Sequence, residues 1–139
     1  MIQIQAEPWA RMVEHAQSAY PNECVGVMLG TGSDVKMVEV ALPMENVSPG
    51  AKWERYQLAS GDLLAADAEA RRLGLTLIGV YHSHPDCDAY FSQTDLKNSC
   101  PWYSFVVLSV RNGVYDHANS WLPDSEQTAA QQETLITEA

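Results

Sequence analysis

Basic residues are scarce in this chain, which has 8 Lys and Arg against 18 Asp and Glu in 139 residues and a formal net charge of −10. A chain with this charge is repelled by phosphate backbones and anionic lipid, so we expect neither nucleic acid nor a membrane surface as a partner. Long hydrophobic runs are also missing, because no apolar stretch approaches the roughly 20 residues that span a bilayer. The first four residues, Met-Ile-Gln-Ile, form neither a basic n-region nor an apolar h-region, so no signal peptide is predicted.

Cysteine is scarce as well. The three cysteines, Cys24, Cys87 and Cys100, are odd in number and widely spaced, which does not indicate a disulfide framework. Cys24 is predicted to be a small buried hydrophobe at the start of a strand, and Cys87 an incidental loop thiol. With no signal peptide and no disulfide framework, we expect a cytoplasmic protein.

What remains is the composition of a globular protein, with 46% hydrophobic and 19% charged residues. The length suits a single domain, which we place at residues 1–123. After Pro123 the chain is polar, and residues 124–139 are predicted to form a tail or a short helix.

Hydrophobic periodicity predicts an α+β fold with a mixed sheet. A first helix is expected over residues 8–20, and a second over 60–73 with Ser60 as its N-cap and Gly74 as its end. Strands are predicted over residues 24–29, 35–42, 75–81, 104–110 and 114–122. The first two strands pair as a hairpin through a turn at 31–34, and residues 43–57 form a long loop of the kind that is usually functional or mobile.

Two histidines at the end of a predicted strand are separated by one residue. In an extended segment residues two apart point to the same face, so His82 and His84 can present two imidazoles to one ion. Asp95, on a helical turn that Ser92 is predicted to cap, can supply a carboxylate oxygen as a third ligand. Two nitrogens and one oxygen, with a fourth position left for water, make the ligand set of a catalytic zinc site. Glu23, at the start of another strand, is a candidate base for the proton of that water.

The spacing excludes several other metal sites. The chain has no His-Glu-x-x-His, and the zinc deaminase pattern fails because Cys100-Pro101 is in the reverse order with no second cysteine after it. Residues 82–87 resemble the metallo-β-lactamase run His-x-His-x-Asp-His, but Cys87 replaces the last histidine. A two-histidine, one-carboxylate iron site stays open, because these ligands alone do not choose iron over zinc.

The order and spacing of these residues resemble the JAMM family of zinc metallopeptidases, also called MPN+ or JAB. The family motif is a Glu, then His-Ser/Thr-His-Pro, then seven residues counted after the second His, then Ser-x-x-Asp. This chain has every part at that spacing: Glu23, His82-Ser83-His84-Pro85, the seven residues 85–91, and Ser92-Gln93-Thr94-Asp95. Residues 21–26, Pro-Asn-Glu-Cys-Val-Gly, are similar to a signature of the small stand-alone prokaryotic members, and the resemblance spans residues 5 to 122.

The resemblance implies one zinc ion per chain, held by His82, His84 and Asp95 with a water as fourth ligand. It implies Glu23 as the general base that later passes the proton to the leaving amine, and Ser92 as the hydroxyl that stabilises the oxyanion. Family members hydrolyse the peptide or isopeptide bond after the C-terminal Gly-Gly of ubiquitin or ubiquitin-like proteins. Small prokaryotic members act on ubiquitin-like sulfur carrier proteins, from which they remove C-terminal residues or carrier-bound cysteine, and we expect such a carrier as the substrate.

The same resemblance implies the JAB/MPN-type fold, which is cytidine deaminase-like: a mixed, mainly antiparallel β-sheet flanked by helices in a single domain. A homodimer is compatible with it, because small family members often self-associate. Two alternatives belong to other functional classes. One is a non-catalytic MPN scaffold, and the other is a DNA-associated protein like RadC, which the net charge of −10 disfavours.

Overall fold

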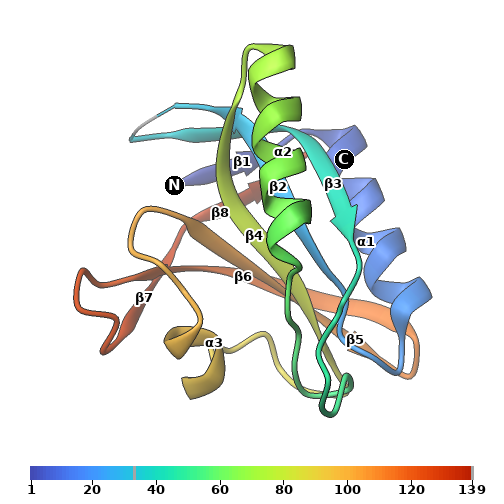
Figure 1. Cartoon of the computed structure of the whole chain (residues 1–139). Helices are drawn as coiled ribbons and strands as arrows, with labels where there is room; N and C mark the ends of the chain where they lie inside the picture. Colours follow the sequence, from blue (N-terminus) through green and yellow to red (C-terminus); the bar gives the residue numbers. More distant parts are fainter. Residues whose placement is uncertain (33, 139) are drawn as a thin grey trace.

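The computed structural model describes residues 1–32 and 34–138, so Ser33 of the expected hairpin turn and the last residue lie outside it. Three helices and eight strands follow one another along the chain (Figure 1). They are β1 (Ile2–Ile4), α1 (Ala6–Ala19), β2 (Val25–Thr31), β3 (Lys36–Met44), α2 (Ser60–Leu73), β4 (Thr76–Pro85), α3 (Gln93–Lys97), β5 (Ser104–Arg111), β6 (Val114–Pro123), β7 (Ala130–Glu133) and β8 (Leu135–Thr137). No helix among the described residues is both long and apolar enough to cross a membrane.

All eight strands belong to one mixed sheet in the order β7-β6-β5-β4-β2-β3-β1-β8. The pairs β2–β3, β2–β4, β5–β6 and β6–β7 are antiparallel, whereas β4–β5, β1–β3 and β1–β8 are parallel. Only Thr134 separates β7 at one edge from β8 at the other, so the two edges of the sheet must come together. The predicted hairpin of the two strands after α1 is confirmed.

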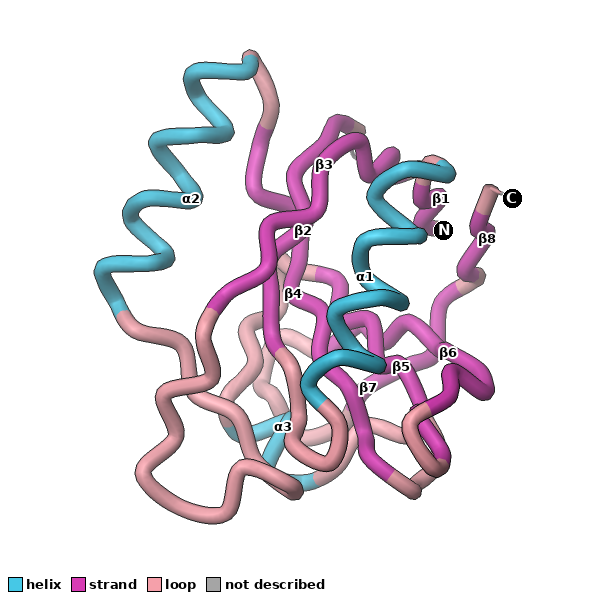
Figure 2. The backbone as a smooth tube through the Cα atoms, turned by 90° about the vertical axis from the view of Figure 1, so that its right-hand side faces the viewer, coloured by secondary structure: helices cyan, strands magenta, loops and turns pink. Residues whose placement is uncertain are grey.

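Both faces of the sheet are buried, each under its own helix (Figure 2). The α1 helix packs Met12 and Ala16 against one face, in a core that includes Tyr81 of β4. The α2 helix packs Ala66 and Ala70 against the other face, in a core that includes Val80. Val80 packs on the α2 side, and because alternate residues of a strand share a face, His82 and His84 at the end of β4 face the same side, where α3 also lies.

Two details of the expected elements are corrected. Ser60 is the first residue of α2 rather than its N-cap, because the carbonyl of Ala59 already accepts the N–H groups of Asp62 and Leu63. Gly74 ends that helix in the left-handed conformation, as expected. The three-residue strand β1, with Ile2 and Ile4 fully buried, was not predicted, because it is too short to show a periodicity.

The C-terminal residues differ from the expected tail or short helix. They form strands β7 and β8, which pair with β6 and β1 respectively. Edge strands depend on backbone pairing and leave polar side chains in water, so the polar composition of residues 124–138 gave no sign of them.

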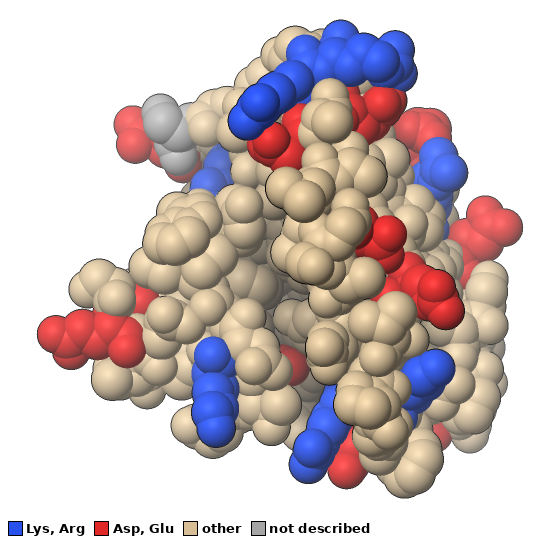
Figure 3. Space-filling model, viewed as in Figure 1, with Lys and Arg blue, Asp and Glu red and all other residues tan. Residues whose placement is uncertain are grey.

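The face that carries α2 and α3 is hollowed at its centre in Figure 3, and Lys and Arg gather on it mainly at the top. The hollow corresponds to a groove of about 450 Å³, here called the apolar groove. Its apolar and aromatic lining residues are Tyr56, Leu58, Leu63, Val80, Tyr103 and Phe105.

Candidate metal centre and active site

The end of β4 carries the two histidines singled out in the sequence. This strand lies in the interior of the sheet, paired with β2 on one side and β5 on the other. His82 and His84 extend from the same face of it, two residues apart, and are 0% and 4% exposed. The sheet therefore holds two imidazoles side by side with little freedom to move.

Asp95 reaches the histidines from the first turn of α3. The helix opens with a capping box, in which the Ser92 hydroxyl accepts the Asp95 N–H at 2.9 Å and the Asp95 Oδ2 accepts the Ser92 N–H at 3.1 Å. This reciprocal pair satisfies two N–H groups at the helix start and fixes the carboxylate. The predicted cap at Ser92 is thus confirmed, and the same pair aims Asp95 at the histidines.

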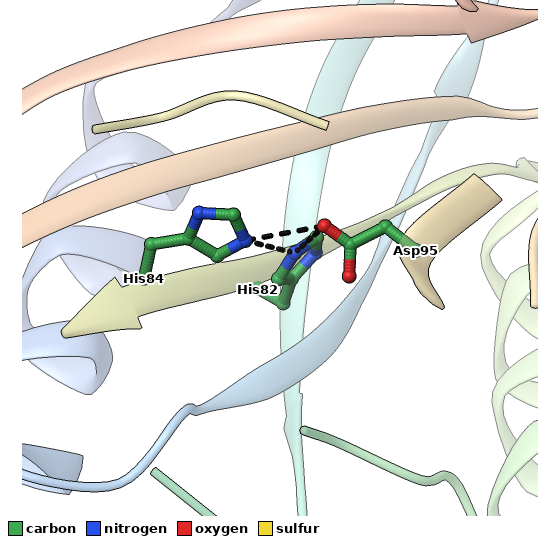
Figure 4. A group of neighbouring side chains, drawn as sticks. All are labelled: His82, His84 and Asp95. Atoms are coloured by element: carbon green, nitrogen blue, oxygen red, sulfur yellow. Dashed lines mark hydrogen bonds and ion pairs between the residues drawn. The ribbon is translucent and has the colours of Figure 1, made fainter. Parts of the chain in front are cut away.

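The three side chains converge on one point (Figure 4). Oδ2 of Asp95 is 3.1 Å from Nε2 of His82 and 3.1 Å from Nε2 of His84, and the two Nε2 atoms are 3.2 Å apart. Ligands bound to a tetrahedral ion at about 2.0–2.1 Å lie about 3.3 Å from one another, so the spacing of these atoms fits such an ion. His82, His84 and Asp95 form a buried group that can hold a metal.

The electrostatics of this group favour a cation. Burial works to raise the pKa of Asp95, but the imidazoles of His82 and His84 outweigh it and hold the pKa below its ordinary value. The carboxylate is therefore ionised, as a metal ligand must be. Nδ1 of His84 contacts the carbonyl oxygen of Asp88 at 2.9 Å, and a proton on Nδ1 leaves the Nε2 lone pair free for a metal.

Glu23 precedes β2 and is 4% exposed. Its backbone is held by two hydrogen bonds, from its own N–H to the Lys52 carbonyl at 2.7 Å and from the Asn46 amide to its carbonyl at 3.0 Å. Its Oε1 atom has no hydrogen-bond partner among the described residues. Burial raises the pKa of Glu23 to about 7, against the opposing effect of His82 and His84. A carboxyl group with this pKa can both accept and return a proton near neutral pH.

Glu23, His84 and Ser92 line one small cavity of about 60 Å³, here called the mouth cavity. Trp53, Glu54 and Tyr90 also line it. The structure thus brings all five candidate residues to one place, with His82 and Asp95 in contact with His84.

The loop over residues 45–59 contributes Trp53 and Glu54 to the mouth cavity and Tyr56 to the surroundings of His82. Asn46 organises this loop, because its amide donates to the Arg55 carbonyl while its Oδ1 accepts the N–H groups of Ser48 and Gln57. The Tyr56 ring, held in this way, packs on the His82 imidazole with centroids 4.7 Å apart. This aromatic contact excludes water from one side of the metal-binding group.

The loop between the histidines and α3, residues 86–91, is here called the ligand loop. Three side chains of β6 form hydrogen bonds with the backbone of one of its residues, Ala89. Ala89 donates its N–H to His117 at 3.0 Å, and its carbonyl accepts from Asn119 at 3.2 Å and from the Trp121 indole at 3.1 Å. Because the neighbouring Asp88 carbonyl contacts His84, these side chains hold that histidine in place indirectly.

No sequence motif predicts that His117, Asn119 and Trp121 support the ligand loop. The only sequence signal is that 117, 119 and 121 alternate along a strand and so share a face. His117, expected to be structural or exposed, is structural. His15 contacts the Tyr81 hydroxyl at 2.8 Å on the opposite face of the sheet, away from the metal-binding group.

None of the three cysteines belongs to the metal-binding group, although Cys87 lines the mouth cavity. Cys24 is buried in the core on the α1 side of the sheet, and its backbone N–H donates to the Ser83 hydroxyl at 2.8 Å. Cys87 is exposed and Cys100 half-buried. Cys24 is therefore the small buried hydrophobe that the sequence predicted.

Comparison with known proteins agrees with this fold. The family model described as prokaryotic homologs of the JAB domain matches residues 5–124. The chain is 33% identical over 111 residues to the CysO-cysteine peptidase of Mycobacterium tuberculosis, covering 78% of this chain and 73% of that one. It is 32% identical over 97 residues to the desampylase of Haloferax volcanii, covering 69% of this chain and 68% of that one.

A solved structure shares the fold. It is a JAB1/MPN domain protein from Archaeoglobus fulgidus, with a TM-score of 0.63, 16% identity and 99% of each chain covered. The mixed sheet flanked by helices is the JAB/MPN fold predicted from the sequence. The chain belongs to the Prok-JAB family.

Proposed function

We propose that this protein is a zinc-dependent peptidase that hydrolyses the bond after the C-terminal Gly-Gly of a ubiquitin-like sulfur carrier protein. The observation that carries the proposal is the convergence of His82, His84 and Asp95 on one point beside the buried carboxyl group of Glu23. The names of two relatives, a CysO-cysteine peptidase and a desampylase, support a peptidase of this substrate class.

Zinc would be held by His82, His84 and Asp95. Two imidazoles and one carboxylate are its ligands in catalytic sites, and the donor atoms are spaced for a tetrahedral ion. When bound, zinc polarises a carbonyl and lowers the pKa of water toward neutrality.

The remaining chemistry belongs to the chain itself. Glu23 accepts a proton from the attacking water and passes it to the leaving amine. Its pKa of about 7 supports this role, as does its Oε1, which has no hydrogen-bond partner within residues 1–32 and 34–138. The Ser92 oxygen already accepts the Asp95 N–H, so its own hydrogen remains free to donate to the oxyanion. Tyr56 and the ligand loop fix the two imidazoles.

The apolar groove is the path we assign to the substrate tail. It begins at Val80, which lies two residues before His82 on the same face of β4. Tyr56 lines the groove and its ring packs on His82, so this ring lies between the groove and the metal-binding group. An extended, flexible tail ending in Gly-Gly is narrow enough to approach the metal site between these aromatic side chains.

The scaffold and RadC-like alternatives have less support. A non-catalytic scaffold has no need of a buried carboxyl group beside the ligands, yet Glu23 is 4% exposed. The chain carries only 8 Lys and Arg, which does not favour a phosphate backbone as partner.

The test combines metal content with turnover. Mass spectrometry on protein purified without added metal should find one zinc per chain, and the metal should be lost in His84→Ala. Glu23→Gln should keep zinc but lose at least about a hundredfold in turnover of carrier fusions. Full activity in Glu23→Gln would remove Glu23 as the base, and iron in place of zinc would overturn the zinc peptidase.

A further inference from the structure

The mouth cavity and the apolar groove flank the metal-binding group along β4. The groove begins at Val80, before His82, whereas the mouth cavity lies at His84 and beyond. If the substrate tail occupies the groove, as proposed above, the amine that leaves must depart through the mouth cavity. Its lining residues therefore face the leaving group.

Two aromatic side chains form the open part of this cavity. Trp53 is 62% exposed and Tyr90 is 51% exposed. Tyr90 packs edge-on against the His84 imidazole with centroids 4.9 Å apart, which places its ring next to the reacting centre. Large aromatic surfaces left open beside a site can cover the apolar stem of a ligand.

The charge of this cavity has one sign. Glu23 and Glu54 both line it, and none of its lining residues is Lys or Arg. The negative charge of Glu54 is one of the influences that raise the pKa of Glu23, so the two carboxyl groups interact electrostatically. Among the described residues, Glu54 forms no ion pair that would neutralise it.

The nearest cations in the sequence do not line the cavity. Arg55 lines a separate hollow with Thr94 and Asn98. Lys52 contributes its backbone carbonyl, which accepts the Glu23 N–H. The cavity lining therefore holds no Lys or Arg that would compensate the charge of Glu54.

We infer that Glu54 makes this protein selective, by charge, for leaving amines that carry no carboxylate next to the scissile bond. This inference rests on the proposed function. A free amino acid released from the Gly-Gly end carries its α-carboxylate one carbon from the departing nitrogen, where it meets Glu54. The side-chain amine of a lysine, or the first residue of a longer chain, brings no such charge, and its apolar stem can lie against Trp53 and Tyr90.

Two probe peptides that differ by one charge test the inference. Both end in Gly-Gly-Ala, one as the free acid and the other as the carboxamide, and each is given to the zinc-loaded protein. The wild type should cleave the carboxamide about threefold to fivefold faster in kcat/KM, the size expected of one exposed charge pair. Glu54→Gln should bring the two rates together, and Glu54→Lys should reverse the preference.

Glu14→Gln is the matched control, because Glu14 is an exposed carboxylate on α1, across the sheet. It should leave the ratio of the two rates unchanged. An equal ratio in wild type, Glu54→Gln and Glu54→Lys would overturn the inference while leaving the peptidase intact. Failure of the zinc-loaded wild type to cleave either peptide would instead count against the proposed function, and the inference would fall with it.

Binding of the product amine gives a second readout that does not depend on turnover. In an NMR titration, alaninamide should shift the signals of Trp53 and Tyr90 at about threefold to fivefold lower concentration than alanine does. Glu54→Gln should remove that difference. Equal binding of the two ligands to the wild type would contradict the role of Glu54.

Discussion

The ring of His117 in β6 accepts a hydrogen bond from the backbone N–H of Ala89, with Nε2 and N 3.0 Å apart. Nδ1 of the same ring contacts Asp116 at 2.6 Å, which favours a proton on Nδ1 and a free lone pair on Nε2. This hydrogen bond links the ligand loop to a residue 28 positions further along the chain. Since the adjoining Asp88 carbonyl contacts His84, the geometry of a metal-binding residue depends on β6.

The hydrogen bonds between β6 and Ala89 are here called the β6 anchor. We predict that weakening this anchor lowers the affinity for the metal, although no metal ligand is removed. His117→Ala should lower zinc affinity by about tenfold, the lower end of what indirect supports of metal ligands contribute. His117→Gln, which keeps an acceptor, should recover part of the loss. Competition with a chromophoric chelator measures the affinity.

The Trp121→Phe variant tests the same anchor from its other side. It removes the indole N–H that donates to the Ala89 carbonyl but keeps an aromatic ring against Phe91. Its effect should be smaller than that of His117→Ala, because Asn119 still donates to the same carbonyl. Trp9→Phe, on α1 across the sheet, is the control and should bind zinc as the wild type does. Unchanged affinity in His117→Ala would show that β6 does not position the ligands.

The contrast between motif and anchor explains what the sequence could and could not predict. His82, His84 and Ser92-x-x-Asp95 lie within 14 residues, and strand and capping geometry bring them together locally. Their convergence was therefore predictable from spacing. Trp121 and His117 reach the ligand loop through tertiary structure, which no short pattern encodes.

The same reasoning applies to the fold. Hydrophobic periodicity predicted the helices and central strands, because these elements bury one or both faces. Strands β7 and β8 did not, because backbone pairing at the sheet edges stabilises them and their side chains are mostly polar or exposed. Ser60 illustrates the limit at element ends, where a one-residue shift moved the cap to Ala59.

Removing the metal should lower the stability of the protein. Binding to the folded state alone adds about 2.7 kcal/mol when the free metal is a hundredfold above its dissociation constant. For a chain of this size that corresponds to about 10 °C in Tm. Thermal unfolding with and without a chelator measures the shift, which should be absent in His84→Ala. The same Tm for the metal-loaded and chelated wild type would contradict metal binding by the folded protein.

Replacing Gly26 is predicted to destabilise the protein because of the neighbouring residue Tyr81. A Cβ atom at position 26 would lie 2.3 Å from the ring of Tyr81, which is fully buried. Gly26→Ala should therefore lower the free energy of unfolding by about 1–3 kcal/mol, the usual cost of overpacking. In Gly61→Ala, by contrast, the new methyl group meets nothing within 4 Å, and the helix should gain about 0.4–1 kcal/mol. Urea denaturation of the pair provides the comparison, and equal effects would contradict the steric argument.

Ser92 has a structural bond in this fold and a catalytic role in our proposal, and two variants separate them. Its hydroxyl caps α3 by accepting the Asp95 N–H. Ser92→Ala should cost about 1 kcal/mol of stability, whereas Ser92→Gly should cost only a few tenths, because glycine is tolerated at this position of a helix. Both variants lose the hydroxyl donor, so both should lose about a hundredfold or more in turnover. Ser92→Thr keeps the hydroxyl and should retain most activity. Urea denaturation and turnover on the carrier fusions are measured for each variant. If turnover instead fell only in proportion to the lost stability, with Ser92→Gly nearly as active as the wild type, Ser92 would be a helix cap alone.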